Sequence, residues 1–548
     1  MNTHETINTL ISLIHHHELI AAGAQKRIAA DVATLDAAAS PRLGEGPVQI
    51  YLRSLAWREG VAFGIARSEH ERFLFAAAAQ DPGAAAVGAL ALEPARFTGP
   101  DSAAAGAESA DAAPAAEPGL WLATGPLSPA NARALHELFP WTRPVSLRSR
   151  TTTIGMGDRL GVATAGHLRA ARQFDLAPVL AQQSVRENDF IGRAFSDVVA
   201  NATWGVFQEG YRGGYGADGD HLKNIPAIDT ALAAGMPMIT LDLTEVMKPE
   251  VADWTVDQVR EGFQQLDPDE QKRITADYVD GTYTLPSGTE ITFDEVEAQR
   301  CAVMYGPAIT LSAEVNQHLK SATGDAFDLE ISIDETTTPT LPAHHLFIAR
   351  ELEIAGVTVN SLAPRFIGEF QKAIDYIGDL EEFRRQFRVH CEISRRYGNY
   401  KISVHSGSDK FSAYPAVGEE TGGRLHLKTS GTSWLEALRT VALYDHELYR
   451  EIHTFVVDYY PTALSFYHIT PDFASIPPLE SVADEGLANY LEDPNARQML
   501  HISYGGILQN DDLRDKLYAS LHEHEDEYAE LLRRHFERHI EPLGIARR

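Results

Sequence analysis

From about residue 150 the sequence alternates short strand-like segments with longer helical ones, and this rhythm constrains the fold more than any other feature. The segments that read as strands are Thr151–Met156, Pro178–Ser184, Thr203–Glu209, Met238–Thr244, Asp328–Asp334, Val357–Leu362, Lys401–His405 and Arg424–Lys428. Strands that alternate with helices predict a parallel sheet, and eight is the number that closes a (β/α)8 barrel of the TIM type. We therefore expect an α/β barrel, with an open doubly wound sheet as the alternative.

Three segments between these strands have distinct local patterns. HHLFIARELEIAG (344–356) predicts a helix that ends at Gly356, a typical residue just past a helix C-terminus. FIGEFQKAIDYIGD (366–379) predicts a second helix. In contrast, GYGADGDHLKN (214–224) is rich in glycine and predicts a flexible loop.

The N-terminal region, residues 1–145, predicts a separate mixed α+β unit. Its opening (5–37) has a helical pattern, and strand-like pieces follow at Val48–Leu52 and Val61–Ile65. Residues 83–118 consist mainly of Ala, Gly, Pro and Ser and have few large apolar side chains. Such a stretch buries too little surface to offset its ordering entropy, so we expect a flexible insert there.

The barrel is expected over residues 146–445, followed by a helical region over 446–548 that packs on it. An acidic insertion, residues 249–300, follows one of the predicted strands and contains the hairpin-like sequence YTLPSGTEITF. Because it lies after a strand end, this insertion is a candidate lid.

Charge and cysteine content exclude several classes of protein. The 548 residues include 47 Lys+Arg and 77 Asp+Glu, a formal net charge of −30, which repels phosphate backbones and anionic bilayers. Two cysteines are too few for a disulfide framework, and no apolar run approaches the roughly 18 residues of a membrane span. The first residues lack the pattern of a secretory signal. We therefore expect a cytoplasmic protein that binds neither nucleic acid nor membranes.

Polar residues alternate with apolar ones along several of the predicted strands, so they share one face. In a barrel the apolar face packs on the helices, and the polar face points inward. This face carries Asp242, Glu330, Asp334, His405, His426 and Lys428. Buried charges are costly unless they are paired or bind a metal, and this residue set suits a divalent cation of the Zn, Mn, Ni or Co type.

Further polar residues follow the strand ends, where the active sites of such barrels lie. GMGDRLG (155–161) carries Arg159, QQSVREND (182–189) carries Glu187, and KTSGTS begins at Lys428. The GxGxxxG spacing within 155–161 departs from the dinucleotide fingerprint GxGxxG, which argues against NAD binding.

The strings GMGDRLG, GADGDHLK, EISIDET and HLKTSGTSWLEALR give the chain a resemblance to a known family. From about residue 145 to its end, the chain resembles the tagaturonate/fructuronate epimerases, which include tagatose 4-epimerases. The resemblance implies a metal-dependent barrel enzyme of bacterial hexuronate catabolism. Its substrate would be a small sugar acid, with D-tagaturonate and D-fructuronate interconverted.

The chemistry of that reaction agrees with a metal site. The two sugars differ at C4, whose C–H is not acidified by the ketone at C2, so enolisation cannot invert it. Loss of the C4 hydroxyl proton instead permits retro-aldol cleavage of C3–C4, rotation of the aldehyde and re-addition. A divalent cation can stabilise the enediolate, and an acid/base pair can move the hydroxyl proton.

These considerations assign roles to nine residues. The metal ligands are predicted to be His221, Glu330 and His405, while Asp334, His426 and His344 are alternatives for one of these positions. Asp220 and Glu187 are candidates for the acid/base pair. Substrate binding is assigned to Arg365, Lys428 and Arg159, which would hold the uronate carboxylate, and to His426.

Two other functions fit the same residues. A metal-dependent aldolase or ketose isomerase of this fold would share the metal and the enediolate. A non-enzymatic sugar-acid binding protein would need the Arg and Lys side chains that hold the carboxylate, but it would not need the inward-facing acids and histidines that could bind a metal. The sequence leaves open which metal binds and whether a uronate or a neutral ketose is preferred, and it is compatible with a homo-oligomer.

Overall fold

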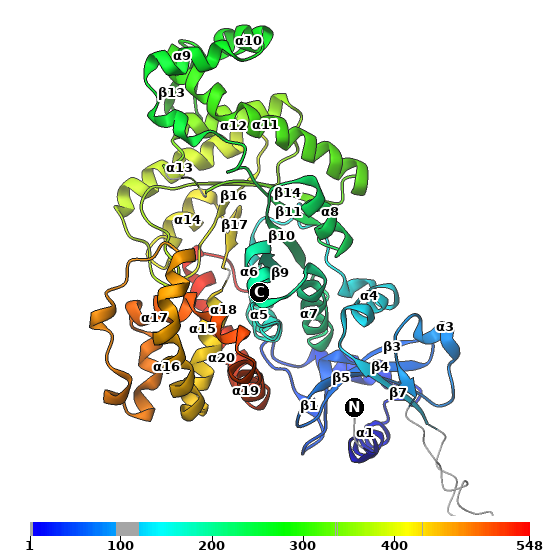
Figure 1. The fold of residues 1–548 in the computed structure, drawn as a ribbon. Coiled ribbons are helices and arrows are strands. Elements are labelled where there is room, and N and C mark those ends of the chain that lie inside the picture. Colours follow the sequence, from blue (N-terminus) through cyan, green and yellow to red (C-terminus); the bar gives the residue numbers. More distant parts are fainter. Residues whose placement is uncertain (1–3, 95–119, 335, 337, 430) are drawn as a thin grey trace, which may run out of the picture.

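The centre of the molecule is a closed barrel of eight parallel strands (Figure 1). The structure is a computed structural model that describes residues 4–94, 120–334, 336, 338–429 and 431–548. The strands are β8 (Thr153–Gly155), β9 (Ala177–Ser184), β10 (Gly216–Leu222), β11 (Met238–Asp242), β14 (Asp328–Ile333), β15 (Ser361–Pro364), β16 (Lys401–Val404) and β17 (Leu425–Lys428). They pair in the order β10-β11-β14-β15-β16-β17-β8-β9 and back to β10. The predicted (β/α)8 barrel is confirmed, and the open sheet is excluded.

One of the eight predicted strands is wrong. Thr203–Glu209 is not a strand, because it lies in the second half of α7 (Phe195–Gln208) and just beyond it. Its β-branched and aromatic residues favoured a strand, but the buried Val198, Ala202 and Val206 recur every four residues along one helix face. The helical spacing of apolar residues along the whole of α7 therefore outweighs the β-propensity of its second half.

The missing strand is β10, which lies within the segment 214–224 that we expected to be a loop. Its glycines allow close packing instead of flexibility: a Cβ on Gly216 would lie 2.9 Å from side-chain atoms of Leu147 and of Val179 on β9. Only a small residue permits this approach of neighbouring chains.

Helices surround the barrel and join its strands. They are α5 (Thr164–Ala171), α6 (Val185–Ile191), α7, α8 (Ile225–Ala233), α11 (Glu295–Thr323), α12 (Pro342–Ile354), α13 (Leu380–Arg396), α14 (Tyr414–Thr421) and α15 (Thr432–Tyr444). The helix predicted at 344–356 is confirmed by α12, whereas residues 366–379 form no helix. Val357–Leu362 overlaps β15 only at its end.

The N-terminal region forms an antiparallel sheet with helices beside it. Its strands follow the order β1 (Arg42–Leu43), β2 (Gln49–Tyr51), β4 (Val61–Arg67), β5 (Arg72–Ala78), β7 (Trp121–Pro126) and β6 (Glu93–Pro94), and β3 (Ala56–Arg58) pairs with β4. The helices are α1 (His4–His16), α2 (Ala24–Ala33), α3 (Gly83–Val87) and α4 (Pro129–Leu138). Most of the predicted flexible insert, from residue 95 onward, lies outside the described residues.

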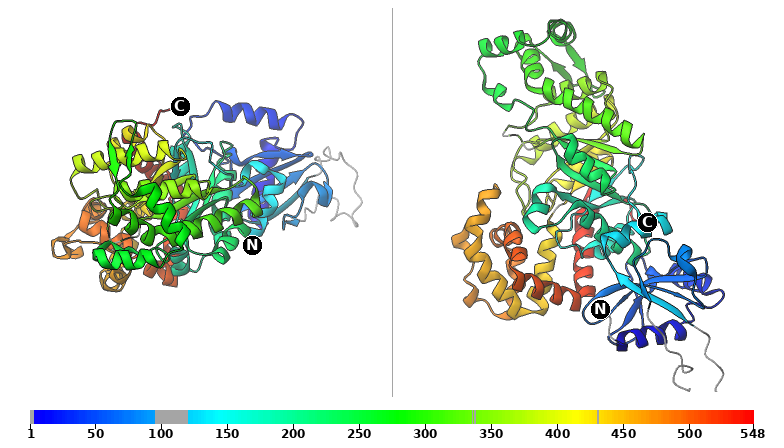
Figure 2. Two further views of the ribbon diagram at one scale, coloured as in Figure 1. Left: turned by 90° about the horizontal axis from the view of Figure 1, so that it is seen from above. Right: turned by 45° about the vertical axis from the view of Figure 1, so that its right-hand side comes forward.

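The insertion and the C-terminal helices lie on different sides of the barrel (Figure 2). The insertion consists of α9 (Val256–Gln264), α10 (Pro268–Tyr278) and the predicted hairpin, β12 (Thr282–Thr284) with β13 (Glu290–Thr292). It packs on the outer helices α11 and α12. The C-terminal helices are α16 (His446–Ala463), α17 (Pro494–Ile502), α18 (Tyr504–Gln509), α19 (Asp511–Glu523) and α20 (Glu525–Ile540).

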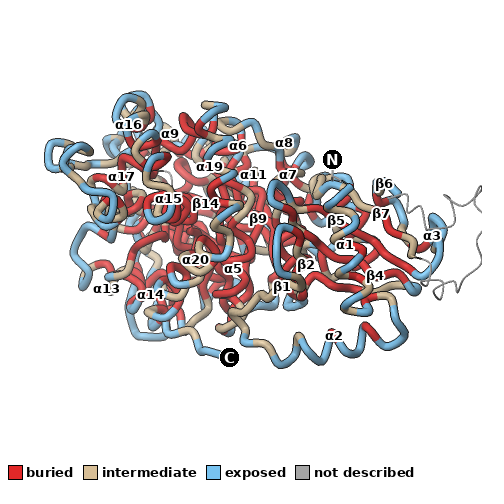
Figure 3. Tube along the Cα trace, turned by 90° about the horizontal axis from the view of Figure 1, so that it is seen from below, coloured by how far each residue is buried: buried red, intermediate tan, exposed pale blue. Residues whose placement is uncertain are grey.

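The barrel strands form the buried centre of the molecule (Figure 3). A single apolar core unites the inner faces of the surrounding helices with the strands, and it extends into α16 to α20. Among the described helices, none is both long and apolar enough to cross a membrane.

Glu525, the first residue of α20, connects the C-terminal helices to the N-terminal sheet. Its carboxylate accepts hydrogen bonds from the Tyr51 hydroxyl (2.6 Å) and from Arg67 (3.2 Å). Arg42 and Arg72 lie 3.4 Å and 3.8 Å away. Burial alone would raise the pKa of Glu525, but the three arginines and Tyr51 outweigh it and lower the pKa to about 2.

We expect Glu525→Gln to lose about 3–5 kcal/mol of unfolding free energy at neutral pH, since three arginines lose their shared partner. Because the folded-state pKa is below the ordinary value of 4.5, this stabilisation is present above pH 4.5 and is lost as the pH falls toward 2. Urea denaturation at pH 7 and pH 3 should therefore show a difference from wild type that shrinks at the lower pH. The exposed neighbour Glu523→Gln is the control; equal losses in both variants would contradict the assignment.

Candidate metal centre

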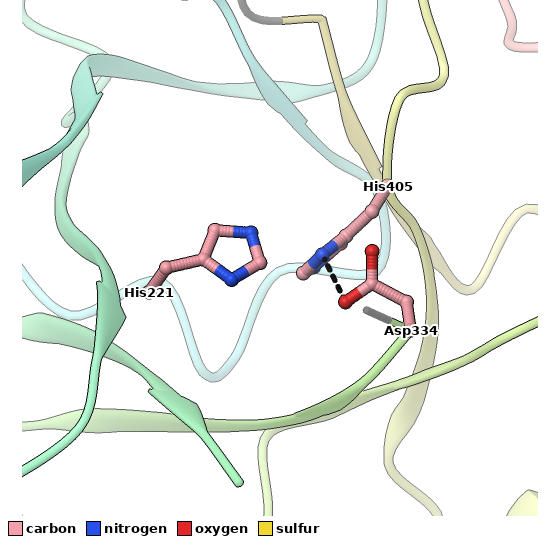
Figure 4. A group of neighbouring side chains, drawn as sticks. All are labelled: His221, Asp334 and His405. Atoms are coloured by element: carbon pink, nitrogen blue, oxygen red, sulfur yellow. Dashed lines mark ion pairs between the residues drawn. The ribbon is translucent and has the colours of Figure 1, made fainter. Parts of the chain in front are cut away.

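Three side chains with metal-binding atoms meet at the carboxyl-terminal mouth of the barrel (Figure 4). His221 lies at the end of β10, Asp334 follows β14, and His405 follows β16. One ligand atom from each lies within 4.8 Å of those of the other two. The two imidazole rings approach edge to face, with centroids 5.2 Å apart.

His221 reaches this position through an irregularity in β10. The pairing of β10 with β11 changes register between Gly219 and Leu222, and His221 has a left-handed backbone conformation with φ of 57°. Bulges of this kind are common beside active sites because they redirect a side chain. Nδ1 of His221 lies 3.5 Å from Oδ2 of Asp242.

Two carboxylates fix the imidazole of His405. Its Nε2 lies 2.6 Å from Oε1 of Glu330, and its Nδ1 lies 3.0 Å from Oδ1 of Asp334. An ionised carboxylate only accepts hydrogen bonds, so Nε2 donates to Glu330. The Nδ1 contact with Asp334 is a close ion pair, and both of its atoms are possible metal ligands. Glu330 thus orients His405, as carboxylates do in metal sites. Asp334, one of the alternatives, groups with His221 and His405, whereas the predicted ligand Glu330 contacts His405 from the other side of its ring.

The protonation of His405 follows from the same contacts. Burial disfavours the imidazolium, but the charges of Asp334 and Glu330 outweigh this effect and raise the pKa of His405 to about 8. A metal ion bound at Nδ1 would displace this proton, since imidazole binds metals in its neutral form.

Lys428 occupies the centre of the acidic cluster below the ligands. Its Nζ lies 2.6 Å from Asp220, 2.9 Å from Asp218 and 2.9 Å from Glu330, and it donates to Thr240 at 2.5 Å. Burial alone would lower the pKa of Lys428, but these carboxylates raise it well above its ordinary value. Lys428, predicted to bind the uronate carboxylate, thus has three acidic partners within the protein and holds these carboxylates together.

The buried charges favour an added cation. Asp218, Asp220, Glu330 and Asp334 surround the site, whereas Lys428 and a protonated His405 supply the positive charge. Burial raises the pKa of Asp218 to about 6, and the charges of Asp220 and Glu330 act in the same direction against the opposing effect of Lys428. A divalent ion held by two imidazoles and a carboxylate would neutralise the excess negative charge, so the donor set fits the predicted metal.

The acid/base candidates lie at the edge of this cluster. Asp220 is 3.9 Å from Nε2 of His221; burial favours its neutral form, but Lys428 and the two histidines lower its pKa to about 2. Glu187 bonds to Arg159 at 2.6 Å, and the charge of Asp220 acts on it. Burial alone would raise the pKa of Glu187, but Arg159 lowers it. Both groups are therefore held in the ionised form.

Three other predicted residues have partners of their own. Arg159 is 1% exposed, and its guanidinium lies 3.8 Å from the ring centre of Tyr504 in addition to pairing with Glu187. His426 lies 2.9 Å from the Thr153 hydroxyl, and burial lowers its pKa to about 3. His344 lies between Tyr305 and Glu297, in a different cluster from His221 and His405. The structure does not bring these three to the ligand group.

A cavity of about 270 Å³ opens beside Asp334 and His405, and cations line it. Arg365, which was predicted to bind the uronate carboxylate, is among them, and Nε of its guanidinium is buried without a hydrogen-bond partner in the described part of the chain. Sequence reasoning assigned no role to two further cations, Arg186 and Lys372. Lys372 lies within the predicted helix 366–379. Its position soon after the end of a predicted strand could have marked it as a site residue, because active sites of such barrels lie at the strand ends.

Lys428→Met should lower the unfolding free energy by about 3–5 kcal/mol at neutral pH, because three buried carboxylates lose their shared ammonium. Without it their pKa values rise, so this variant should gain stability as the pH falls from 7 to 5, relative to wild type. Chemical denaturation at the two pH values measures both effects. Lys320→Met, at an exposed position, is the control, and a loss no larger than in this control would refute the assignment.

Comparison with known proteins gives consistent matches. The sequence model of a family described as tagaturonate epimerase matches residues 103–543. A tagaturonate/fructuronate epimerase of Thermotoga maritima is 42% identical over 413 residues, which cover 75% of this chain and 85% of that protein. The native crystal structure of a fructuronate-tagaturonate epimerase from Cohnella laeviribosi matches with a TM-score of 0.82 at 38% identity, covering 95% of this chain and all of that one. A glycerol complex of that protein gives 0.80 at 39% identity, over 91% and 97% of the two chains.

Proposed function

The chain belongs to the tagaturonate epimerase family, and on this basis we propose that it inverts C4 of D-tagaturonate and D-fructuronate by metal-dependent retro-aldol cleavage and re-addition. The family makes it a carbohydrate epimerase, an isomerase. The observation that carries the metal dependence is the convergence of His221, Asp334 and His405 at the mouth of the barrel.

The chain's residues suit the stereochemical problem at C4. A C4–H bond is too weakly acidic to be broken by a carboxylate base, because the ketone is one carbon too far away. The C4 hydroxyl loses its proton more readily. The C3–C4 bond can then break, which leaves an enediolate on C1–C3 and an aldehyde on C4–C6. Rotation of the aldehyde before re-addition produces the epimer.

Three residues would hold the divalent cation, and a fourth would orient one of them. A cation of the Zn, Mn, Ni or Co type bound by His221, Asp334 and His405 would supply a Lewis acid for negative charge on substrate oxygen. Glu330 holds His405 through its Nε2 proton and so keeps Nδ1 directed to the site.

Asp220 and Glu187 are the proposed proton-moving groups. Asp220 lies next to His221 and is held ionised by Lys428, so it can accept the C4 hydroxyl proton of a bound sugar. Glu187, kept ionised by Arg159, can accept a proton in the reverse direction. Epimerisation needs a proton acceptor for each of the two hydroxyl orientations, which agrees with two carboxylates.

The uronate carboxylate is proposed to bind Arg365. Its guanidinium lies in the cavity beside two of the metal ligands, and among the described residues it forms no ion pair. Arg forks match a carboxylate in a bidentate manner, which would hold the sugar by the end opposite to the reacting ketone. Lys372 and Arg186 add positive charge to the same cavity.

We also propose the cytoplasm as the location of the enzyme. Both cysteines, Cys301 and Cys391, are free and buried, as expected for a protein of a reducing compartment. Its relatives are enzymes that act on sugar acids.

Removal of divalent metal by a chelator should abolish epimerase activity, and re-addition of Zn, Mn, Ni or Co should restore it with at least one of these ions. Elemental analysis should then show that His405→Ala loses bound metal, while His426→Ala, at another buried barrel histidine, retains it. Glu330→Gln should bind metal about 10–100-fold more weakly, as expected when a partner of a ligand is lost. Full activity of the metal-free enzyme would refute metal dependence.

The retro-aldol step predicts that the hydrogen on C4 stays on its carbon throughout. Epimerisation of tagaturonate in D2O should therefore give fructuronate without deuterium at C4, which NMR can measure. Deuterium at C4 would show removal of the C4 proton and contradict the proposed cleavage. Accumulation of three-carbon fragments in place of the epimer would instead favour an aldolase.

A further inference from the structure

The segment between β15 and α13 forms a wall of the cavity without being a helix. Residues 366–379 contribute several lining side chains, Lys372 among them. Glu369 and Ile377 exchange two backbone hydrogen bonds of 2.8 Å and 3.2 Å, which close the segment into a loop. Since a buried backbone must still satisfy its polar groups, the carbonyl oxygens between these two residues need other donors.

Side chains from distant parts of the sequence supply those donors. Four consecutive carbonyl oxygens accept hydrogen bonds: Gln371 and Ile374 from Lys410 (2.8 and 2.6 Å), Lys372 from Gln498 (3.2 Å), and Ala373 from Arg497 (2.9 Å). Arg497 and Gln498 belong to α17, so the C-terminal helices fix this part of the cavity wall.

Lys410 is the central donor of this arrangement. It is 1% exposed, and its third hydrogen bond goes to the carbonyl of Ser408 at 2.8 Å. An ammonium group has three N–H donors, and here each one meets a backbone carbonyl. In the described parts of the chain no carboxylate lies within ion-pair distance of Lys410. The lysine thus joins the wall segment to the loop that follows His405.

This attachment positions the side chains that face the cavity. Lys372 has its carbonyl held from behind by Gln498, and its own Nζ donates to the Ser406 hydroxyl at 3.2 Å, next to His405. Arg365 begins the same segment, and its backbone N–H donates to the Thr340 hydroxyl. A shift of the segment would therefore move Lys372 relative to the metal ligands.

We propose that Lys410 is a positioning residue for substrate binding, which holds the wall segment so that its cations meet the substrate carboxylate. This role rests on the proposed function, in which the cavity takes a ketohexuronate. Lys410 touches no substrate and acts through the backbone of residues 371–374.

The test compares two buried lysines. Lys410→Met should raise KM for tagaturonate about tenfold while kcat changes less than about threefold, because the loss affects ground-state binding. Lys401→Met is the matched control: Lys401 is also fully buried, and it donates to Thr153 (3.2 Å) and Leu147 (3.5 Å), outside the cavity. It should lower thermal stability and leave KM unchanged. An unchanged KM in Lys410→Met, or an equal rise in Lys401→Met, would overturn the proposal.

Hydrogen exchange gives an independent measure on the holoenzyme. The amides of Glu369 and Ile377 should exchange faster in Lys410→Met and remain protected in Lys401→Met; equal protection in both would overturn the proposal. Should Lys410→Met not fold, Gln498→Leu, which removes one donor, should raise KM about twofold with faster exchange of the same amides. Wild-type enzyme that is inactive on ketohexuronates would contradict the proposed function, whereas the exchange result bears on Lys410 alone.

Discussion

The ammonium of Lys428 inside the barrel is the interaction on which the site depends. It holds Asp218, Asp220 and Glu330 together in a space where three carboxylates would otherwise repel one another. Glu330 in turn bonds Nε2 of His405, and this bond directs Nδ1 toward Asp334, where the metal is proposed to bind. The orientation of His405 thus depends on the ion pairs of Lys428 inside the barrel, because Lys428 fixes Glu330 and Glu330 fixes His405.

Acidic groups outnumber cations inside the barrel mouth, whereas three cations line the adjoining cavity. The strands carry the acids and imidazoles, which give the interior an excess of negative charge suited to a cation. Two of the cations that line the cavity, Arg365 and Lys372, come from the segment after β15. A sugar acid that spans the two regions would place its carboxylate on the loop side and its ketone on the metal side, so charge separation alone would orient the substrate.

The sequence allowed prediction of the barrel and of the inward polar face, because the period of two along a strand is a local property. It did not show that Asp334, and not Glu330, groups with His221 and His405, since both acids lie on the same face of one predicted strand. The choice depends on which one lies beside His221, and β10, which carries His221, looked like a glycine loop. Residues 366–379 have a helical pattern, but their carbonyls bond to Lys410 and to residues of α17 far along the chain. Tertiary contacts of this kind leave no local signal.

The C-terminal helices belong to the active site and are more than a cover on the barrel. α17 holds the cavity wall through Arg497, and the carbonyl of its His501 accepts a hydrogen bond from Arg159. The ring of Tyr504, in α18, lies against the same guanidinium and so keeps it beside Glu187. Both the segment proposed to bind the substrate carboxylate and Glu187, one of the groups proposed to move protons, are therefore positioned by residues beyond the eighth strand. A barrel that lacked these helices would retain the metal ligands but lose the supports that align the substrate with them.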